Sequence, residues 1–407
     1  MFRRTRILQA ALLTLLTTAC AGGPAGVEPG DATAARTGAQ PGTPPLAPAA
    51  AVQPQPLPDT PINAGRSEVS SRPFQRTEGV LEPDIEAYAE EVARLRGVPL
   101  QHVRSLLLDA RYNASAAKLM APSSTRIRRS WVTYRNRYVE PVRIRTGQQF
   151  WQENAAQLAR TQQAHGVPAS IIVAIIGVET VYGRYTGDFR VLDTLATLGF
   201  RYPDASRPER SHLFRNQLAD LIQLDFLGQL NARAATGSFA GAMGLPQFMP
   251  GSLMRYAADG DRDGAIDLHG STADAIESVA RFLRLHGWVP GLPVFAPVTL
   301  PNNPASFVTG GLEPTLTWAQ LEAAGARAQP AHAAGAWQQH PLGMVNLVDE
   351  PRNTVEFRVG TPNFFALTHY NRSYFYASSV ADLAQELERR VGLNGPTTAQ
   401  LKTPVER

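Results

Sequence analysis

Glu179 is the residue whose type and setting most clearly indicate chemistry. It is the first ionisable side chain after residues 169–178, which carry no charge. A carboxyl group in such apolar surroundings is driven towards its neutral form, so its pKa rises. A carboxylic acid that stays protonated near neutral pH can protonate the oxygen of a leaving group. The alternative is that Glu179 marks the solvated end of a core helix, because Gly183 follows within about one turn and is available as its C-terminal cap.

An acidic loop is the second group of candidate residues. Asp259, Asp261 and Asp263 alternate along the chain, and Gly264 follows at the position of a sharp turn. This pattern opens an EF-hand calcium loop, although Gly270 stands where that motif closes with glutamate. The spacing predicts a cation site, and an acidic turn filled by Na⁺ or water is the alternative. The eight histidines show no metal-ligand spacing, so zinc is not expected.

Amphipathic or apolar helices must position these residues. The helix at 169–180, with Pro168 at its first position, is apolar on every face and is therefore expected at the centre of the fold. Apolar residues three and four positions apart predict further helices at 85–95, 103–108, 150–164, 213–227, 273–285 and 379–391.

Residues 293–360 have a different pattern. Short β-rich runs at 294–300, 344–348 and 354–359 are separated by proline, glycine and asparagine. They predict a small antiparallel sheet inserted in a mostly helical protein.

Composition limits the class of protein. The chain has 407 residues, of which 43% are hydrophobic and 18% charged, so a fully disordered or collagen-like protein is excluded. The net charge of +4 is too small to indicate a nucleic-acid partner. Cys20 is the single cysteine, which excludes an internal disulfide and a cysteine-built metal site.

The N-terminus has the pattern of an export signal. Three arginines within residues 3–6 precede an apolar run at 7–16 that is too short to span a bilayer. Cys20 after Ala19 resembles a bacterial lipoprotein signal, in which the cysteine is lipidated. Thr17 replaces the usual leucine, so an ordinary secretory signal is the alternative. Residues 21–63 contain ten prolines and predict a disordered tether, which we extend to residue 78.

Several motifs in consistent order resemble those of lytic transglycosylases. They are ETVYG at 179–183, GSFAGAMGLPQFMP at 237–250, HGW at 286–288 and THYNRS at 368–373. By these motifs, residues 80–393 are similar to the membrane-bound lytic murein transglycosylase B family, glycoside hydrolase family 103, with an SLT-type domain. The resemblance implies a lysozyme-like (α+β) catalytic core with a helical flanking domain and a small antiparallel β subdomain.

The resemblance also implies a reaction. Such enzymes cleave the β-1,4 bond between N-acetylmuramic acid and N-acetylglucosamine in peptidoglycan. Glu179 would act as acid on the glycosidic oxygen and then as base on the C6 hydroxyl of the same muramic acid, closing a 1,6-anhydro ring. An intramolecular nucleophile explains how one carboxylate suffices where most glycosidases need two.

The resemblance extends to residues around the acid and in the acidic loop. Phe282 departs from it, because the family often has tyrosine there; a phenyl ring can stack on a sugar but cannot donate a hydrogen bond. The implied substrate-binding residues are Tyr134, Ser238, Gln247, Phe282, Tyr370, Asn371 and Tyr376. The implied ligands of a structural Ca²⁺ are the side chains of Asp259, Asp261, Asp263 and Asp274 and the carbonyl of Ala265. Asp267 either contributes through water or caps the following helix.

The expected organisation is a signal peptide at 1–20, the tether at 21–78, a catalytic region at 79–393 and a tail at 394–407. Within the catalytic region we expect a helical flanking part at 79–145 together with the C-terminal helix, the lysozyme-like core at 146–290 and the β part at 291–365. We expect a monomer in the periplasm of a Gram-negative bacterium, attached to the outer membrane through lipidated Cys20. Its partner is peptidoglycan. Two alternatives stay open: a catalytically silent peptidoglycan-binding lipoprotein and a hydrolytic muramidase.

Overall fold

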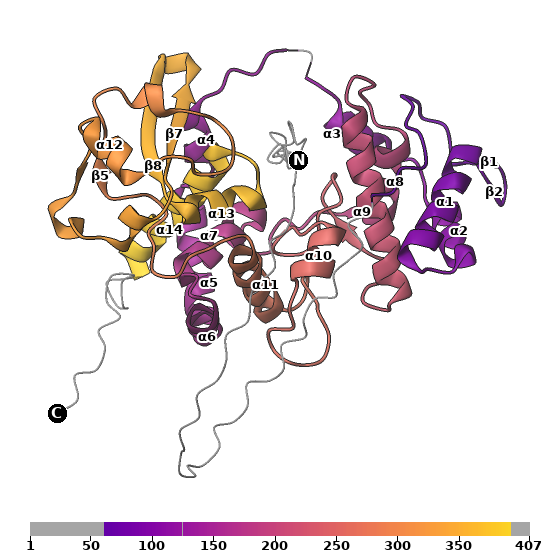
Figure 1. Cartoon of the computed structure of the whole chain (residues 1–407). Coiled ribbons are helices and arrows are strands. Elements are labelled where there is room, and N and C mark those ends of the chain that lie inside the picture. Colours follow the sequence, from indigo (N-terminus) through magenta and orange to yellow (C-terminus); the bar gives the residue numbers. More distant parts are fainter. Residues whose placement is uncertain (1–60, 124, 392–407) are drawn as a thin grey trace, which may run out of the picture.

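The computed structural model describes residues 61–123 and 125–391, and most of this part of the chain is helical (Figure 1). Its buried apolar side chains form three clusters, each enclosed by its own helices or strands. The strands are short and pair in twos, all antiparallel. The mainly helical class expected from the sequence is confirmed. The predicted signal peptide, Cys20 and the predicted tail at 394–407 lie outside the described residues.

The first cluster surrounds helix α7 (Ala169–Thr180), which carries Glu179. Every residue of α7 except Glu179 is buried, as expected for a helix that is apolar on all faces. Helices α5, α6, α11 and α14 pack directly on α7. The helices that supply this cluster besides α7 are α4 (Trp131–Tyr138), α5 (Pro141–Glu153), α6 (Ala155–His165), α11 (Thr272–Leu285), α13 (Pro362–Tyr370) and α14 (Tyr374–Val391).

The second cluster lies on the other side of α10 (Pro250–Tyr256) in Figure 1. Leu253 of α10 packs against both clusters and so joins them. The second cluster is enclosed by β1 (Gln75–Thr77), β2 (Val80–Leu81), α1 (Pro83–Arg96), α2 (Leu100–Asp109), α3 (Ala114–Met120), α8 (Val191–Phe200) and α9 (Pro208–Phe226). The strand pair β3 (Phe189–Arg190) and β4 (Thr236–Gly237) runs beside it.

Residues 61–78 correct the predicted extent of the tether. Ile62 and Phe74 are buried in the second cluster, with 0% and 2% of their surface exposed. The backbone N–H of Ile62 also donates to Asn216 of α9. The tether predicted through residue 78 therefore does not include this segment, because its few large apolar side chains have a partner surface far along the chain.

The third cluster contains the β part. Strands β7 (Gly343–Asp349) and β8 (Thr354–Gly360) pair along their full length, whereas β5 (Val298–Thr299) pairs with β6 (Arg327–Ala328). The predicted run at 294–300 therefore does not join the β7–β8 pair as a full strand; it reaches β8 by a single bridge at Phe295. Short helices complete this part: η1 (Pro304–Phe307), α12 (Trp318–Ala323), η2 (Pro330–His332), η3 (Ala336–Gln339) and η4 (Glu350–Arg352).

Two predicted helix boundaries also change. The single helix expected at 150–164 is divided at Asn154, where α5 ends and α6 begins. Pro168 lies directly before the first residue of α7 and not at the first helical position.

No single helix in the described ranges has the length and apolarity of a membrane span; α6 and α7 meet that test only as a pair bent by 115°.

Candidate active site

The chain turns sharply directly after Glu179. Val181, Tyr182 and Gly183 all adopt left-handed backbone conformations, with φ of 51°, 59° and 85°. Val181, not the expected Gly183, is therefore the cap residue of α7. A β-branched residue rarely adopts this conformation, so surrounding contacts must hold it. Thr180 supplies two of them: its hydroxyl donates to the carbonyl of Leu245 (3.0 Å) and accepts the N–H of Gly183 (3.0 Å).

The ring of Tyr182 folds back against two glycines. A Cβ added at Gly147 of α5 or at Gly177 of α7 would overlap the Tyr182 hydroxyl and ring. The absence of side chains at these two positions lets the ring occupy the space between the helices. The Tyr182 hydroxyl is buried and has no hydrogen-bond partner among the described residues. The Tyr182 side chain is therefore positioned by the shape of this space and not by a hydrogen bond of its own.

Glu179 has the electrostatics expected of a general acid. Its side chain is half-buried, and burial of the carboxyl group raises its pKa to about 7. The Tyr376 hydroxyl donates a 2.6 Å hydrogen bond to Oε1 of Glu179, which opposes this rise by favouring the charged form. Among the described residues, these two causes account for the shift, and neither is a second carboxylate. Near neutral pH the group can thus both give and accept a proton.

Tyrosines from three helices surround this carboxyl group. A charge on Glu179 raises the pKa of Tyr134, Tyr138, Tyr370 and Tyr376, in addition to the effect of burial. The structure therefore brings together the three tyrosines expected from the sequence. It adds Tyr138, whose ring lies 5.0 Å from that of Tyr134. Tyr138 was missed, although its position four residues after Tyr134 on α4 places both on one helix face.

Residues 238–247 form an irregular loop beside the end of α7, which it meets through the hydrogen bond from Thr180 to Leu245. The Ser238 hydroxyl accepts the N–H of Ala242 (3.1 Å), which fixes its orientation. Gln247 lies in a left-handed conformation (φ 52°), and its side-chain N–H groups donate to the carbonyls of Thr186 (3.1 Å) and Gly244 (2.9 Å). Because the amide donors of Gln247 are used by the backbone, its oxygen is the group available to a ligand.

The remaining substrate candidates differ in their placement. Tyr370 donates to the carbonyl of Pro246 (2.6 Å) and so joins α13 to the Gln247 loop. The side-chain oxygen of Asn371 is buried with no partner among the described residues. Phe282 does not have the predicted open face for a sugar, because its ring is 5% exposed and packs 4.9 Å from Tyr370 and 4.0 Å from His286. The Phe282 ring therefore supports Tyr370 by packing against it.

The acidic loop brings carboxylates close enough to share a cation. Ligand oxygens of Asp259, Asp261 and Asp263 all lie within 4.8 Å of one another. Backbone N–H groups of Arg262, Asp263 and Gly264 bind Asp259 and lower the pKa of its carboxyl. These oxygens are the hard ligands that Ca²⁺ prefers, so the donor set fits that ion.

Asp274 and Asp267 hold the loop in shape. Asp274 is buried and accepts the N–H groups of Gly260 and Asp267, each at 2.7 Å, so it closes the loop through the backbone. It is not among the three carboxylates that converge. Asp267 does not cap α11 as one alternative had it; Ser271 does, while Asp267 binds the N–H groups of His269 and Gly270. Ala265, a predicted carbonyl ligand, is exposed.

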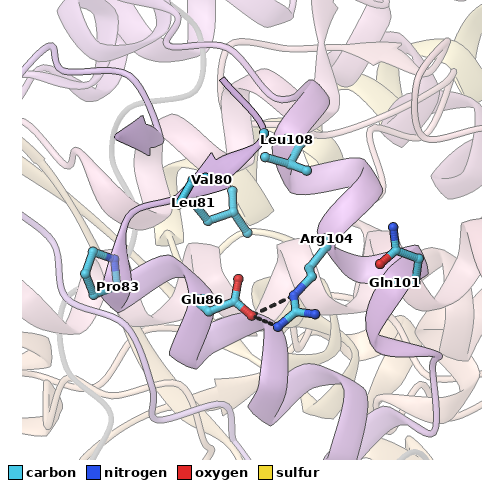
Figure 2. Close-up of a pocket in the computed structure, with 8 residues that line it drawn as sticks. Val80, Leu81, Pro83, Glu86, Gln101, Arg104 and Leu108 are labelled. Carbon is cyan, nitrogen blue, oxygen red and sulfur yellow. Dashed lines mark hydrogen bonds and ion pairs between the residues drawn. The ribbon is translucent and has the colours of Figure 1, made fainter. Parts of the chain in front are cut away.

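Two surface pockets lie apart from these residues. One, of about 470 Å³, lies between β2, α1 and α2, where Arg104 pairs with Glu86 (Figure 2). The other is lined by Arg126, Arg128 and Glu350. Neither pocket contains a residue of the Glu179 group.

Known proteins match the chain over its described part. It is 35% identical over 311 residues to membrane-bound lytic murein transglycosylase B of Escherichia coli (strain K12), covering 74% of this chain and 82% of that protein. Soluble lytic transglycosylase SltB1 from Pseudomonas aeruginosa is similar in structure, with 38% identity and a TM-score of 0.67, covering 76% of this chain and 100% of that one. Escherichia coli Slt35, solved in complex with calcium, has 32% identity and a TM-score of 0.65, covering 78% and 96%.

These matches confirm the resemblance that the motifs suggested and the lysozyme-like class of fold. The family model described as the transglycosylase SLT domain matches residues 81–385, which include Glu179, the tyrosines around it and the acidic loop. The chain therefore belongs to the SLT-domain family of lytic transglycosylases.

Proposed function

We propose that this protein is a lytic transglycosylase that cleaves the β-1,4 bond between N-acetylmuramic acid and N-acetylglucosamine in peptidoglycan. The observation that carries the proposal is the carboxyl group of Glu179, whose pKa burial raises to about 7. It lies within a ring of tyrosines and has no second carboxylate among the causes of its shift. A lone neutral acid suits a reaction whose nucleophile belongs to the substrate.

The reaction uses the same carboxyl group twice. Neutral Glu179 gives its proton to the glycosidic oxygen as the bond from that oxygen to C1 of muramic acid breaks. The C6 hydroxyl oxygen of the same sugar then bonds to C1, and its proton passes to the Glu179 carboxylate. The acid is regenerated, no water is consumed, and a 1,6-anhydro product results. Tyr376, by its hydrogen bond to Oε1, stabilises the carboxylate between the two transfers.

Groups on both sides of Glu179 bind and orient the glycan in this proposal. The free amide oxygen of Gln247 accepts from a sugar hydroxyl or acetamido N–H, since its donors are held by Thr186 and Gly244. Ser238, Tyr134, Tyr370 and Asn371 complete the binding surface. Phe282 contributes by supporting Tyr370.

Calcium, in this proposal, has a structural role. Asp259, Asp261 and Asp263 would hold it, with the carbonyl of Ala265 and with Asp274 closing the loop. When bound, the ion supplies charge neutralisation among these carboxylates and no chemistry on the sugar.

The proposed location is the bacterial envelope. The relative in Escherichia coli is named as membrane-bound, and the N-terminus here has the pattern of a lipoprotein signal. Lipidation of Cys20 would attach the enzyme to the outer membrane from the periplasmic side, within reach of the wall.

Digestion of purified peptidoglycan tests the function. We expect 1,6-anhydromuropeptides by mass spectrometry from the wild type and about a thousandfold less from Glu179→Gln, which cannot give a proton. Glu153→Gln is the matched control, because Glu153 is exposed at the end of α5. Reducing-end muropeptides would instead identify a muramidase, and no released product a silent binding protein. Anhydro products at full rate from Glu179→Gln would disprove the assignment of the acid.

A further inference from the structure

Tyr185 is an aromatic side chain left open beside the proposed active site. It follows the left-handed turn at the end of α7, and 57% of its surface is exposed. An aromatic ring in water loses the favourable burial that such side chains usually obtain. Tyrosine is enriched at binding interfaces, where its ring can be covered while its hydroxyl stays in contact with water.

The backbone on both sides of Tyr185 is fixed to the segments that carry the active-site residues. Its own N–H donates to the carbonyl of Thr180 (3.0 Å), the residue after Glu179. The next carbonyl, that of Thr186, accepts from the Gln247 side chain (3.1 Å). Gly187 then contacts the backbone of Gly237 so closely that a Cβ would overlap it. The backbone at Tyr185 is thus tied to the residue after Glu179 and, through Thr186 and Gly187, to the segment that carries Ser238 and Gln247.

A tyrosine at this position is suited to an extended sugar chain. Pyranose rings present faces of C–H groups that pack on aromatic rings, and a tyrosine side chain has only two χ angles to order when it is covered. The Tyr185 side chain offers a ring face and a hydroxyl group, which suit a ligand rich in C–H faces and hydroxyls. Among the ligands of the proposed reaction, the glycan strand itself has the matching chemistry.

We propose that Tyr185 stacks on a sugar ring of the bound glycan strand next to the bond that is cleaved, and so forms an additional glycan-binding position. This inference rests on the proposed function, because it takes the strand bound at Glu179 as its ligand. Tyr185 does not touch the reacting atoms in this arrangement. It contributes to binding equally before and during the reaction.

Kinetics on soluble, uncross-linked glycan strands test this position in the full-length protein. Tyr185→Ala is expected to raise KM about tenfold, equivalent to about 1.4 kcal/mol, with kcat within about twofold of wild type. Tyr185→Phe keeps the ring and is expected to keep the wild-type KM. Phe226→Ala is the control, since Phe226 is also an exposed aromatic (43%) but lies at the end of α9, where its ring packs on His102 of α2.

Direct binding separates the two proposals. In the Glu179→Gln background, titration calorimetry with the same strands should show a Kd about tenfold higher when Tyr185→Ala is added. If the wild type is active and Tyr185→Ala leaves both KM and Kd unchanged, the stacking position is overturned and the proposed function stands. An equal rise of KM and Kd in Tyr185→Phe, or in Phe226→Ala, would also overturn the stacking position. Failure of the wild type to release anhydro products would instead refute the function.

Discussion

The raised pKa of Glu179 follows from where the apolar helix ends. Ten uncharged positions precede it, and the structure buries all of them while leaving the carboxyl group in reach of Tyr376. Burial favours the neutral acid, and the hydroxyl favours the carboxylate. The balance gives a pKa of about 7. A carboxyl group with this pKa gains or loses a proton near neutral pH at little cost in free energy.

The pH dependence of cleavage follows from this pKa. The first step needs the protonated acid, so activity is present below the pKa and is lost as pH rises through about 7. Tyr376→Phe removes a hydrogen bond that lowers the pKa, so the pKa rises. The alkaline limb of kcat/KM should therefore move to higher pH, by about one unit, for a hydrogen bond to a charged group.

A pH profile from pH 5 to 9 checks the shift. Tyr374→Phe is the control, because the Tyr374 hydroxyl lies on the same helix but donates to Gly311. An alkaline limb that stays in place or moves to lower pH in Tyr376→Phe would contradict the assigned role of the hydroxyl.

The sequence singled out the proposed acid but not all of its surroundings. Glu179 stood out because a single charge ended an apolar run. Tyr134, Tyr370 and Tyr376 came from resemblance to a family, since nothing in local spacing brings α4, α13 and α14 together. Phe282 was misjudged because its type permits stacking on either a sugar or a neighbouring ring, and only packing decides between them.

At the scale of elements, the close approach of α5, α7 and the turn after α7 fixes the position of the acid. Gly177→Ala places a methyl group into the Tyr182 ring, and overpacking of this kind costs about 1–3 kcal/mol. We expect the free energy of unfolding to fall by that amount in urea denaturation. Combining it with Tyr182→Leu should restore part of the loss, because the smaller side chain makes room. If the losses of unfolding free energy in the two single variants simply add in the double variant, the Tyr182 ring is not what the new methyl group overlaps.

The acidic loop is expected to couple calcium to stability. An ion that binds only the folded state at one hundred times its Kd adds about 2.7 kcal/mol, so calcium should raise Tm and chelation should lower it. Asp261→Asn should abolish the response by removing one of the converging carboxylates. Asp188→Asn, at an exposed carboxylate outside the loop, should retain it. A wild-type Tm that does not respond to calcium would rule out the site.

Helices were easier to predict than their interruptions. The apolar spacing continues through residues 150–164, so it gave no sign of the break at Asn154. There the Asn154 side chain donates to the carbonyl of Phe150 (2.9 Å), a local contact that competes with continued helix. The β runs were located, but the 294–300 segment makes only one bridge to β8 because pairing depends on residues distant in sequence.

At the scale of the whole molecule, attachment to a membrane is the expectation that depends on Cys20, which lies outside the described residues. Cys20→Ser should move the protein from the membrane fraction to the soluble periplasmic fraction, because no acyl chain can be added. Its activity on isolated peptidoglycan should equal that of wild type, since Glu179 is untouched. Fractionation and immunoblotting measure the first effect. A variant that stays in the membrane fraction would refute lipid attachment at this residue.

The three clusters could not be deduced from the sequence, because each combines segments that are far apart. Ile62 and Phe74 looked like parts of a tether until their partner surface on α8 and α9 was known. The helices at 83–109 likewise pack with α8 and α9, whereas α4 and α5 pack around α7. Local pattern gives the elements, and long-range contact decides which of them share a core.

The hydrogen bond between Tyr376 and Glu179 joins residues 197 positions apart. During synthesis the segment bearing the acid is made long before α14, and contacts so distant form late in folding. In the unfolded chain the carboxyl group is surrounded by water and ionises at ordinary acidic pH. The neutral acid that the proposed reaction needs is therefore a property of the folded protein, and an unfolded chain in transit to the wall would not carry it.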